Sequence, residues 1–533
     1  MDAATVAGYF KDKSILITGS TGFLGKIFVE KILRIQPDVK KIFLLVRAAD
    51  TSSAEQRVLN EVIGNELFGP LRENYGSNFY SFMKEKISPL AGDIINENLG
   101  LESLEILKLS KEIDIIVNGA ATTNFYERYD VSLASNVLGA KYVCKFAKKC
   151  ANLKMFLHIS TAFVSGEQEG LLLEKVFQIG ETLKEGCHLD IAAELQLVES
   201  VKAELTHSTN GKSEQTEKIT MKKLGLKRAR QFGWPNTYVF TKAMGEMLVG
   251  HFGRELPVVI IRPSIVSSIY HDPLPGWIEG TRTIDSIISA YAKQTIPHFI
   301  GAGHVILDVI PGDMVVNAML VAMAVHWSER GQVIIHVTSS QQNPLSTSTM
   351  LDLMYRYFTA NPQTMGKNGK VVKTKRLNIT NKTGFRAYMF LKYKLPLEVL
   401  HLVNPLLGGY FSQYYNKSIR SYRYFVLLAK LYMPYAFFNA CGRQIRLSRW
   451  RRCRIHRPQN ACDGQQRRAR AMVGNSGNGS SSRSRGREFG GGGSGGGGLA
   501  TANPMVGRLA AADPKVLLAV YPLDACICQQ SDR

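Results

Sequence analysis

A glycine-rich turn near the start of the chain constrains its fold more than any other feature. Residues 18–25 read TGSTGFLG and lie between a short apolar run, Ser14–Thr18, and a segment with helical apolar spacing at 22–34. In this context the first glycine allows a tight turn, the second lets the backbone approach a pyrophosphate, and the third lets the helix pack closely on the strand. Because a helix N-terminus favours anions, we expect a dinucleotide to bind at Gly19, Ser20, Thr21, Gly22, Phe23, Leu24 and Gly25.

The apolar runs that follow the turn favour a layered α/β fold. Five further runs are separated, for the most part, by helical patterns, and they span residues 41–46, 87–90, 113–117, 155–159 and 258–261. Strands that alternate with helices pair in parallel, with helices on both faces of the sheet. The sequence therefore predicts a Rossmann-like, doubly wound parallel sheet.

We expect three regions along the chain. Residues 1–344 form the nucleotide-binding domain, with a polar, helix-prone insertion at about 166–232 that we interpret as a candidate lid. Residues 345–440 are rich in Leu, Tyr and Phe and form a smaller, mainly helical C-terminal region, which either packs on the main domain or offers an apolar surface to acyl chains or a membrane. Residues 441–533 hold 15 Arg, one Lys and a glycine run, which predicts a disordered or aberrant tail.

Composition and charge exclude several classes of protein. No apolar stretch reaches the roughly 18 residues of a membrane span, so a multi-spanning membrane protein is excluded. Much of the net charge of +22 falls in the tail, and an alternative interpretation of the tail is an Arg/Gly-rich segment that binds RNA. Apart from that alternative, we expect no nucleic-acid partner. The cysteines form neither a disulfide framework nor a zinc set, which indicates a reducing compartment and no metal. Residues 1–13 resemble neither a signal nor a transit peptide, so we expect the cytoplasmic face.

The residue after the second predicted strand indicates which dinucleotide binds. An acidic side chain at this point would hydrogen-bond the ribose 2′-hydroxyl of NAD, whereas a guanidinium suits the 2′-phosphate of NADP. This chain has Arg47 directly after the strand and no carboxylate before Asp50. We therefore expect NADPH, and the alternative interpretation of Arg47 is a solvated surface charge.

Tyr238 and Lys242 form a Y-x-x-x-K motif just before the last predicted strand. On a helix, residues i and i+4 share a face, so the phenol and the ammonium can point into one cleft. A free tyrosine has a pKa of about 10 and is a weak acid–base catalyst at neutral pH. A nearby ammonium lowers that pKa because it favours the phenolate, so the pair is a candidate proton donor.

The ends of two central strands supply further candidates. The fifth run is followed by Ser160 and Thr161, either of which supplies a hydroxyl. The fourth run is followed by small and polar residues, including Asn118 and Ala120, which we expect to approach the cofactor. Ligands bind beyond the carboxyl ends of parallel strands in this class of fold, so these side chains should meet at one edge of the sheet.

These motifs together resemble the extended short-chain dehydrogenase/reductases, and among them the plant alcohol-forming fatty acyl-CoA reductases. The resemblance rests on the glycine turn, on residues 238–242, and on 121–130 (ATTNFYERYD), 158–164 (HISTAFV), 262–266 (RPSIV) and 308–313 (DVIPGD). It covers about residues 8–440 and includes a helical C-terminal region like that of the family. It ends where the Arg-rich tail stands in place of the family's acidic segment and further helices.

The resemblance implies catalytic roles for residues of this sequence. Thr161 would hold the substrate carbonyl oxygen, with Ser160 as the alternative. Tyr238 would donate a proton, and Lys242 would bind the nicotinamide ribose and lower the pKa of Tyr238. Asn136 would serve a water-mediated proton relay.

The resemblance also implies a reaction. NADPH, with Asp93 in contact with its adenine, would reduce a long-chain fatty acyl-CoA to an aldehyde and release CoA. A second reduction would give a primary fatty alcohol, as in wax, suberin or cutin synthesis. Lipid substrates are consistent with peripheral association with the endoplasmic reticulum membrane. Two alternatives stay open: another enzyme of the extended superfamily, such as a nucleotide-sugar epimerase or an alcohol dehydrogenase, and an inactive NADP-binding protein whose second domain is incomplete.

Overall fold

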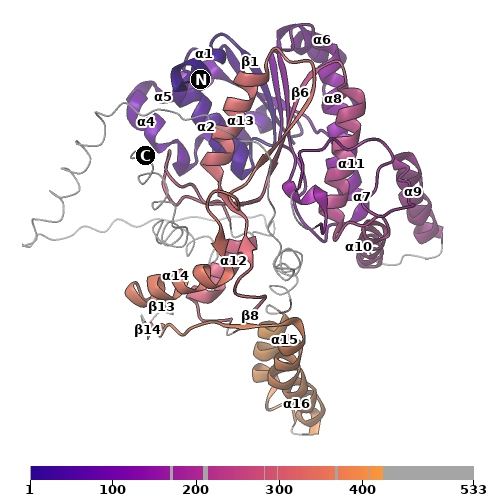
Figure 1. Cartoon of the computed structure of the whole chain (residues 1–533), viewed down its shortest axis with the longest axis vertical. Helices are drawn as coiled ribbons and strands as arrows, with labels where there is room; N and C mark the ends of the chain where they lie inside the picture. The colour runs from indigo at the N-terminus through magenta and orange to yellow at the C-terminus, as the bar shows by residue number, and fades with distance from the viewer. Residues whose placement is uncertain are drawn as a thin grey trace, which may run out of the picture.

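A seven-stranded parallel sheet forms the centre of the molecule (Figure 1). The computed structural model describes residues 2–168, 172–207, 214–280, 283–296, 298–365, 370–406, 408–423 and 426. Neighbouring strands follow the order β11-β6-β5-β4-β1-β2-β3, and all neighbours are parallel. Their bounds are β1 (Ser14–Thr18), β2 (Lys41–Val46), β3 (Ile87–Ala91), β4 (Ile115–Asn118), β5 (Met155–Ile159), β6 (Pro257–Pro263) and β11 (Gly331–Val337). The predicted doubly wound α/β fold is confirmed.

All six strands expected from the sequence are present, with small shifts at their ends. The edge strand β11 was not expected, because only residues 333–335 form an uninterrupted apolar run before His336. Its position comes from pairing with β6, from Gly331 opposite Pro257 to Val337 opposite Pro263. The order of strands reverses between β1 and β4, which is where doubly wound sheets bind ligands.

Residues along each strand alternate between two hydrophobic layers. In β1, Ile15 and Ile17 join the cluster on one face of the sheet, whereas Leu16 joins the cluster on the other face. The first cluster includes residues of α2 (Phe23–Ile35) and α13 (Gly312–His326), and the second includes residues of α6 (Ser103–Glu112) and α8 (Gly139–Lys149). Both faces are covered, which explains why the strand sequences are continuously apolar.

The insertion after β5 is anchored to the helix that follows it. Its two helices are α9 (Ile191–His207) and α10 (Glu214–Gln231), and the next helix is α11 (Thr237–Phe252). Val198 of α9 and Met221 of α10 share a buried cluster with Met244 of α11. The insertion therefore supports the helix that carries the Y-x-x-x-K motif.

A further hydrophobic cluster lies beyond the sheet and combines segments that are distant in sequence (Figure 1). It joins α12 (Thr283–Ala292) to α14 (Thr347–Ala360), through residues such as Ile287 and Met354. Short strand pairs complete this region: β7 (Ile265–Ser267) with β10 (Val309–Pro311), β9 (Ile306–Leu307) with β12 (Leu345–Ser346), β8 (His298–Ile300) with β15 (Asn378–Thr380), and β13 (Thr364–Met365) with β14 (Lys370–Val371). Helices α15 (Lys382–Met389) and α16 (Leu395–Leu406) follow.

The remaining α-helices are α1 (Ala3–Tyr9), α3 (Thr51–Val58), α4 (Gly69–Tyr75), α5 (Phe79–Lys86) and α7 (Tyr129–Ser132). Within the described ranges, no helix has both the length and the apolar character of a membrane span. The tail at 441–533, for which the sequence predicts disorder, lies outside the described residues.

Candidate active site

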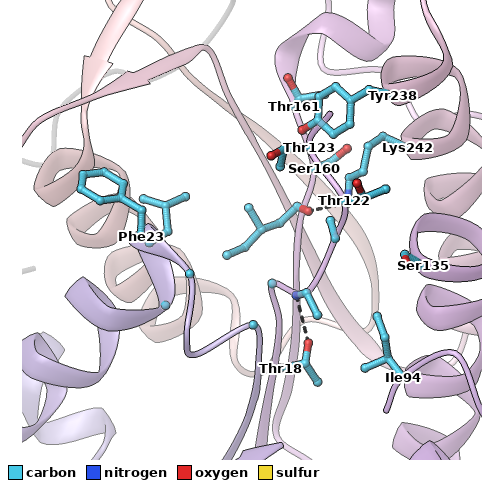
Figure 2. A pocket seen from close by; sticks show the side chains of 18 of the residues that line it. Thr18, Phe23, Ile94, Thr122, Thr123, Ser135, Ser160, Thr161, Tyr238 and Lys242 are labelled. Carbon is cyan, nitrogen blue, oxygen red and sulfur yellow. Dashed lines mark hydrogen bonds between the residues drawn. The ribbon is translucent and has the colours of Figure 1, made fainter. Parts of the chain in front are cut away.

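One cavity of about 1030 Å³ opens at the carboxyl ends of the central strands and is lined by both sets of predicted residues (Figure 2). The glycine turn and Phe23 form one wall, and Thr161, Tyr238 and Lys242 gather on the opposite side. The strand ends thus bring together motifs that are more than 200 residues apart in the chain. The cavity volume is at the upper end of the range for small-molecule sites, about 300–1,000 Å³.

The glycine turn adopts the geometry that a dinucleotide requires. Gly19 has φ +79°, and a Cβ there would lie 2.7 Å from the backbone nitrogen of Ala120. Gly22 is the N-cap of α2, and no side chain covers this helix end with a capping hydrogen bond. A Cβ at Gly25 would collide with the carbonyl oxygen of Gly19, so this glycine permits the close packing of helix on turn. The turn therefore leaves free amides for a pyrophosphate.

Two arginines line the cavity beyond the end of β2. Arg47 lies there as predicted, and Arg57 of α3 joins it, because Arg57 Nη1 donates to the carbonyl oxygen of Arg47 at 2.7 Å. The nearest carboxylate in sequence, Asp50, accepts a hydrogen bond from the backbone nitrogen of Ser53 and so caps α3. Arg57 was not predicted, because its distance of ten residues from Arg47 matches no local motif.

The hydroxyl groups proposed for catalysis lie at the carboxyl end of β5. Thr161 begins a short 3₁₀ turn, and its Oγ1 donates to the carbonyl oxygen of Pro263 at 3.5 Å, a long hydrogen bond. The hydroxyl of Ser160 is buried and has no hydrogen-bond partner among the described residues. The Tyr238 ring packs against Phe125, with 5.7 Å between ring centroids. Both hydroxyl candidates line the same cavity as the Tyr238 phenol.

Lys242 lies at the base of the cavity and is almost fully buried, with 2% of its surface exposed. Its Nζ donates to the carbonyl oxygen of Ile159 at 2.8 Å (Figure 2). Burial lowers the pKa of Lys242 to about 8, against the opposing effect of the Glu246 carboxylate one turn further along α11. The ammonium is therefore poised to lose its proton close to neutral pH.

Several predicted residues contribute from beneath or beside the cavity. Asp93 and Ala120 line it, whereas Ser20, Asn118 and Asn136 are not among the lining residues. Asn118 accepts a hydrogen bond from the Thr18 hydroxyl at 2.9 Å.

Asn136, buried in the π-helical segment η5 (Leu133–Leu138), ties the loop after β4 to α11. Its Oδ1 accepts from the backbone nitrogen of Thr122, and its Nδ2 donates to Thr122 O and to the hydroxyl of Thr241 at 3.0 Å. Its side chain is thus engaged by the loop and by the helix that carries Lys242.

Apolar side chains form a further part of the cavity lining, which we call the apolar wall. Its residues come from five different segments, and they are Phe23, Phe125, Phe163, Ile265 and Met319. Phe125 and Ile265 also belong to the cluster that α12 and α14 share. The cavity therefore has a polar catalytic side next to an apolar surface that suits a hydrocarbon chain.

The chain is similar to a known protein family and to solved structures. A model of an NAD-binding family, described as "Male sterility protein", matches residues 17–319. Among solved structures, the terminal R domain from the myxalamid PKS-NRPS biosynthetic pathway has a TM-score of 0.47 and 21% identity, covering 72% of this chain and 76% of that chain.

Curated relatives are closer in sequence. The chain is 45% identical to "Alcohol-forming fatty acyl-CoA reductase" of Simmondsia chinensis over 441 residues, which are 82% of this chain and 89% of the relative. It is 46% identical to "Fatty acyl-CoA reductase 1" of Arabidopsis thaliana over 435 residues, 81% of this chain and 88% of the relative. Identity at this level over most of both chains shows that this protein belongs to the fatty acyl-CoA reductase family.

Proposed function

We propose that this chain reduces long-chain fatty acyl-CoA to the primary fatty alcohol, through an aldehyde and with release of CoA, at the expense of NADPH. The observation that carries the proposal is the single cavity that joins the glycine turn, the Thr161–Tyr238–Lys242 group and an apolar wall. The names of the relatives, alcohol-forming fatty acyl-CoA reductase and fatty acyl-CoA reductase 1, support the substrate class and the product. A wax, suberin or cutin type of lipid synthesis is the setting that this product suits.

The residues of the cavity divide the chemistry between them. A bound nicotinamide would supply hydride, first to the thioester carbonyl carbon and then to the aldehyde carbon. Thr161 and Tyr238 donate hydrogen bonds to the carbonyl oxygen and stabilise the charge that develops on it. After the first transfer the C–S bond breaks and CoA leaves as a thiolate that takes up a proton. After the second, Tyr238 protonates the alkoxide, and the ammonium of Lys242 favours the phenolate that remains.

Arg47 and Arg57 support NADPH over NADH within this proposal. Both line the cavity at the end of β2, where the adenosine ribose of a dinucleotide lies in this class of fold. The Asp50 carboxylate caps α3, where its Oδ1 accepts from the backbone nitrogen of Ser53. Two guanidinium groups suit a 2′-phosphate through charge-assisted hydrogen bonds, although Arg57 also pairs with the Glu61 carboxylate at 2.8 Å.

The remaining predicted residues, Asp93, Asn118, Ala120 and Asn136, shape the cofactor site or position the segments around it in this proposal. Asp93 and Ala120 line the cavity, where Asp93 would contact the adenine, and Asn118 lies beneath it, bound to the Thr18 hydroxyl that also accepts from Ala120. Asn136, which we infer to serve the proton relay, positions the loop at Thr122 and the helix at Thr241 on either side of the site.

We further propose that the chain associates peripherally with a membrane of the endoplasmic reticulum type on its cytoplasmic face. The support is a patch of exposed apolar residues on and beside α16, where Val399, Leu402 and Leu406 are 53%, 71% and 84% exposed. Lys392 and Lys394 precede this helix, and cations beside an apolar face suit anionic lipid headgroups.

Vesicle sedimentation tests this association. Leu402→Ser with Leu406→Ser should abolish co-sedimentation with anionic phosphatidylserine vesicles. The control is Leu104→Ser with Leu107→Ser, which changes two exposed leucines of α6, 79% and 53% exposed, and should leave sedimentation unchanged. Equal sedimentation of both double variants would contradict the role of α16.

We propose that residues 1–344 form the reductase domain, that residues 345–440 form a helical C-terminal region and that residues 441–533 form a separate tail. The shared cluster of α12 and α14 supports a C-terminal region that packs on the main domain.

Incubation with substrate tests the function directly. The purified full chain is incubated with NADPH and a panel of acyl-CoAs of increasing chain length, and lipid products are identified by mass. Fatty alcohol should form with the wild type and with Tyr142→Phe, a distant tyrosine of α8, and should be lost with Tyr238→Phe. Undiminished product from Tyr238→Phe would refute the assigned proton donor, and absence of product from every acyl-CoA would refute the function.

A further inference from the structure

His158 is a polar side chain buried in β5, and a buried polar side chain requires hydrogen-bond partners. It is 1% exposed, and both ring nitrogens lie within reach of polar partners. Nδ1 lies 3.0 Å from Nδ2 of Asn118, and Nε2 lies 3.3 Å from Nζ of Lys242. Beyond Asn118, the Thr18 hydroxyl donates to Asn118 Oδ1 at 2.9 Å and accepts from the backbone nitrogen of Ala120 at 3.1 Å. A continuous polar chain therefore runs below the cavity from Ala120 to Lys242.

The direction of the hydrogen bonds from Ala120 through Thr18, Asn118 and His158 is linked to the charge of Lys242. The backbone nitrogen of Ala120 can only donate. In the structure Asn118 turns its oxygen towards Thr18, so its amide group donates to Nδ1 of His158, and the proton of the neutral imidazole sits on Nε2. That proton faces Lys242, which accepts it only as a neutral amine.

The opposite orientation of the amide gives the opposite result. Nδ1 of His158 then donates to Asn118 Oδ1, and Nε2 accepts a hydrogen bond from the Lys242 ammonium. The imidazole stays neutral in both arrangements, because burial and the neighbouring Lys242 charge hold the pKa of His158 well below its ordinary value. The amide of Asn118 and the charge of Lys242 therefore change together.

Few other groups act on this ammonium. Ile159 O accepts from it, and Tyr238 and Glu246 lie one turn away on either side along α11. The Glu246 carboxylate is bound by the buried guanidinium of Arg262, with Nη2 and Oε2 at 2.6 Å. In the described part of the chain, the partners within hydrogen-bond distance of Lys242 Nζ are thus the Ile159 carbonyl oxygen and the His158 imidazole.

We propose that His158 is a positioning residue for the reduction: once the Asn118 amide turns its nitrogen towards Thr18, Nε2 of His158 accepts from the Lys242 ammonium and holds it in place for Tyr238, and Nδ1 links that ammonium to Asn118 and Thr18. The proposal rests on the proposed function, because Lys242 is invoked there as the partner of Tyr238. Without this acceptor the buried ammonium loses one of its two fixed hydrogen bonds, so its position and its proton affinity both change.

Two substitutions separate the two nitrogens of the ring. His158→Gln places an amide near the position of Nε2 and can keep the bond to Lys242. His158→Asn places an amide near the position of Nδ1 and can keep only the bond to Asn118. The test reaction is NADPH-dependent reduction of a free long-chain aldehyde, with thermal melting and NADPH fluorescence as measures of folding and of cofactor binding.

The outcomes of the two substitutions differ. We expect His158→Gln to keep kcat within about threefold, and His158→Asn to lose at least tenfold in kcat with little change in KM. In His158→Asn the basic limb of the pH profile should move down by about one pH unit, which corresponds to a tenfold weaker hold on the proton. Equal kcat and equal pH profiles for the two variants, whatever their melting temperatures, would overturn the proposal.

Asn118→Asp provides a second test that does not depend on the folding of the His158 variants. A carboxylate at position 118 can only accept, so Nδ1 must donate and Nε2 must accept from the ammonium. The basic limb of the pH profile should therefore move to higher pH, and an unchanged or lowered limb would contradict the proposal. If wild-type protein reduces neither acyl-CoA nor aldehyde, the proposed function fails, whereas an active wild type with unresponsive variants refutes the role of His158 alone.

Discussion

At the scale of single residues, the protonation state of Lys242 sets the pH range in which the site can work. Burial lowers its pKa to about 8, so the ammonium fraction is high below that pH and declines as pH rises through it. We predict that kcat for aldehyde reduction falls by about tenfold per pH unit above this value, because the charged lysine supports Tyr238. The measurement is a pH–rate profile, and a rate that stays constant from neutral pH to pH 10 would contradict this role.

Arg47 and Arg57 carry the prediction for the cofactor. Replacing either arginine with Gln should raise KM for NADPH by about ten- to a hundredfold, because a hydrogen bond to a charged group contributes about 1.5–3 kcal/mol. KM for NADH, which lacks the 2′-phosphate, should change little. Arg254→Gln is the control, since Arg254 is exposed and does not line the cavity. Equal losses for both cofactors would show that these arginines do not select NADPH.

The residues that could be predicted are those with a local signature. The glycine turn, Arg47, Thr161, Tyr238 and Lys242 each follow or precede a recognisable strand or helix, and the cavity contains them all. Arg57 and His158 have no such signature. An arginine on an amphipathic helix and a histidine within an apolar strand match many structures, and only the fold shows which groups they reach.

At the scale of elements, α10 presents an exposed basic face. Lys223, Lys227 and Arg230 are exposed and recur at helical spacing. Gly225, on the other side of the helix, packs closely on Tyr129, and Glu217 pairs with Arg128, so α10 is fixed against the segment that forms the cavity rim.

We predict that this face attracts the phosphates of CoA. Replacing Lys223, Lys227 and Arg230 with Gln should raise KM for acyl-CoA at least tenfold at low ionic strength, with a smaller effect at high salt. Reduction of the free aldehyde, which lacks CoA, should be unchanged. A matched triple variant of exposed lysines, Lys84, Lys145 and Lys148, should affect neither substrate. If both substrates respond equally to the α10 variant, the helix has another role.

Elements with a strong hydrophobic period were predictable, and short ones were not. Strands β1 and β2 of the central sheet, for example, are buried over almost their whole length and read as apolar runs. The strands at Ile306–Leu307, Leu345–Ser346 and Thr364–Met365 have two residues each, too few to show any period. Such pairs exist because the surrounding chain holds them together.

At the scale of the whole molecule, the cavity forms where the sheet meets the cluster shared by α12 and α14. Its apolar wall comes from five distant segments, so no window of sequence predicts which residues face the substrate. The fold class was predictable because the glycine turn and the alternation of elements admit few topologies. The substrate pocket was not, because it depends on contacts between residues as far apart as Phe23 and Met319.

The ratio of NADPH oxidised to CoA released tests the central claim most directly. Both quantities are followed in one reaction of the full chain with a long-chain acyl-CoA, by NADPH absorbance and by a thiol reagent. Reduction of the thioester to the alcohol consumes two hydrides for each CoA, so we predict a ratio of two. A ratio of one would show that the reaction stops at the aldehyde, and CoA release without NADPH oxidation would show hydrolysis; either result contradicts the account.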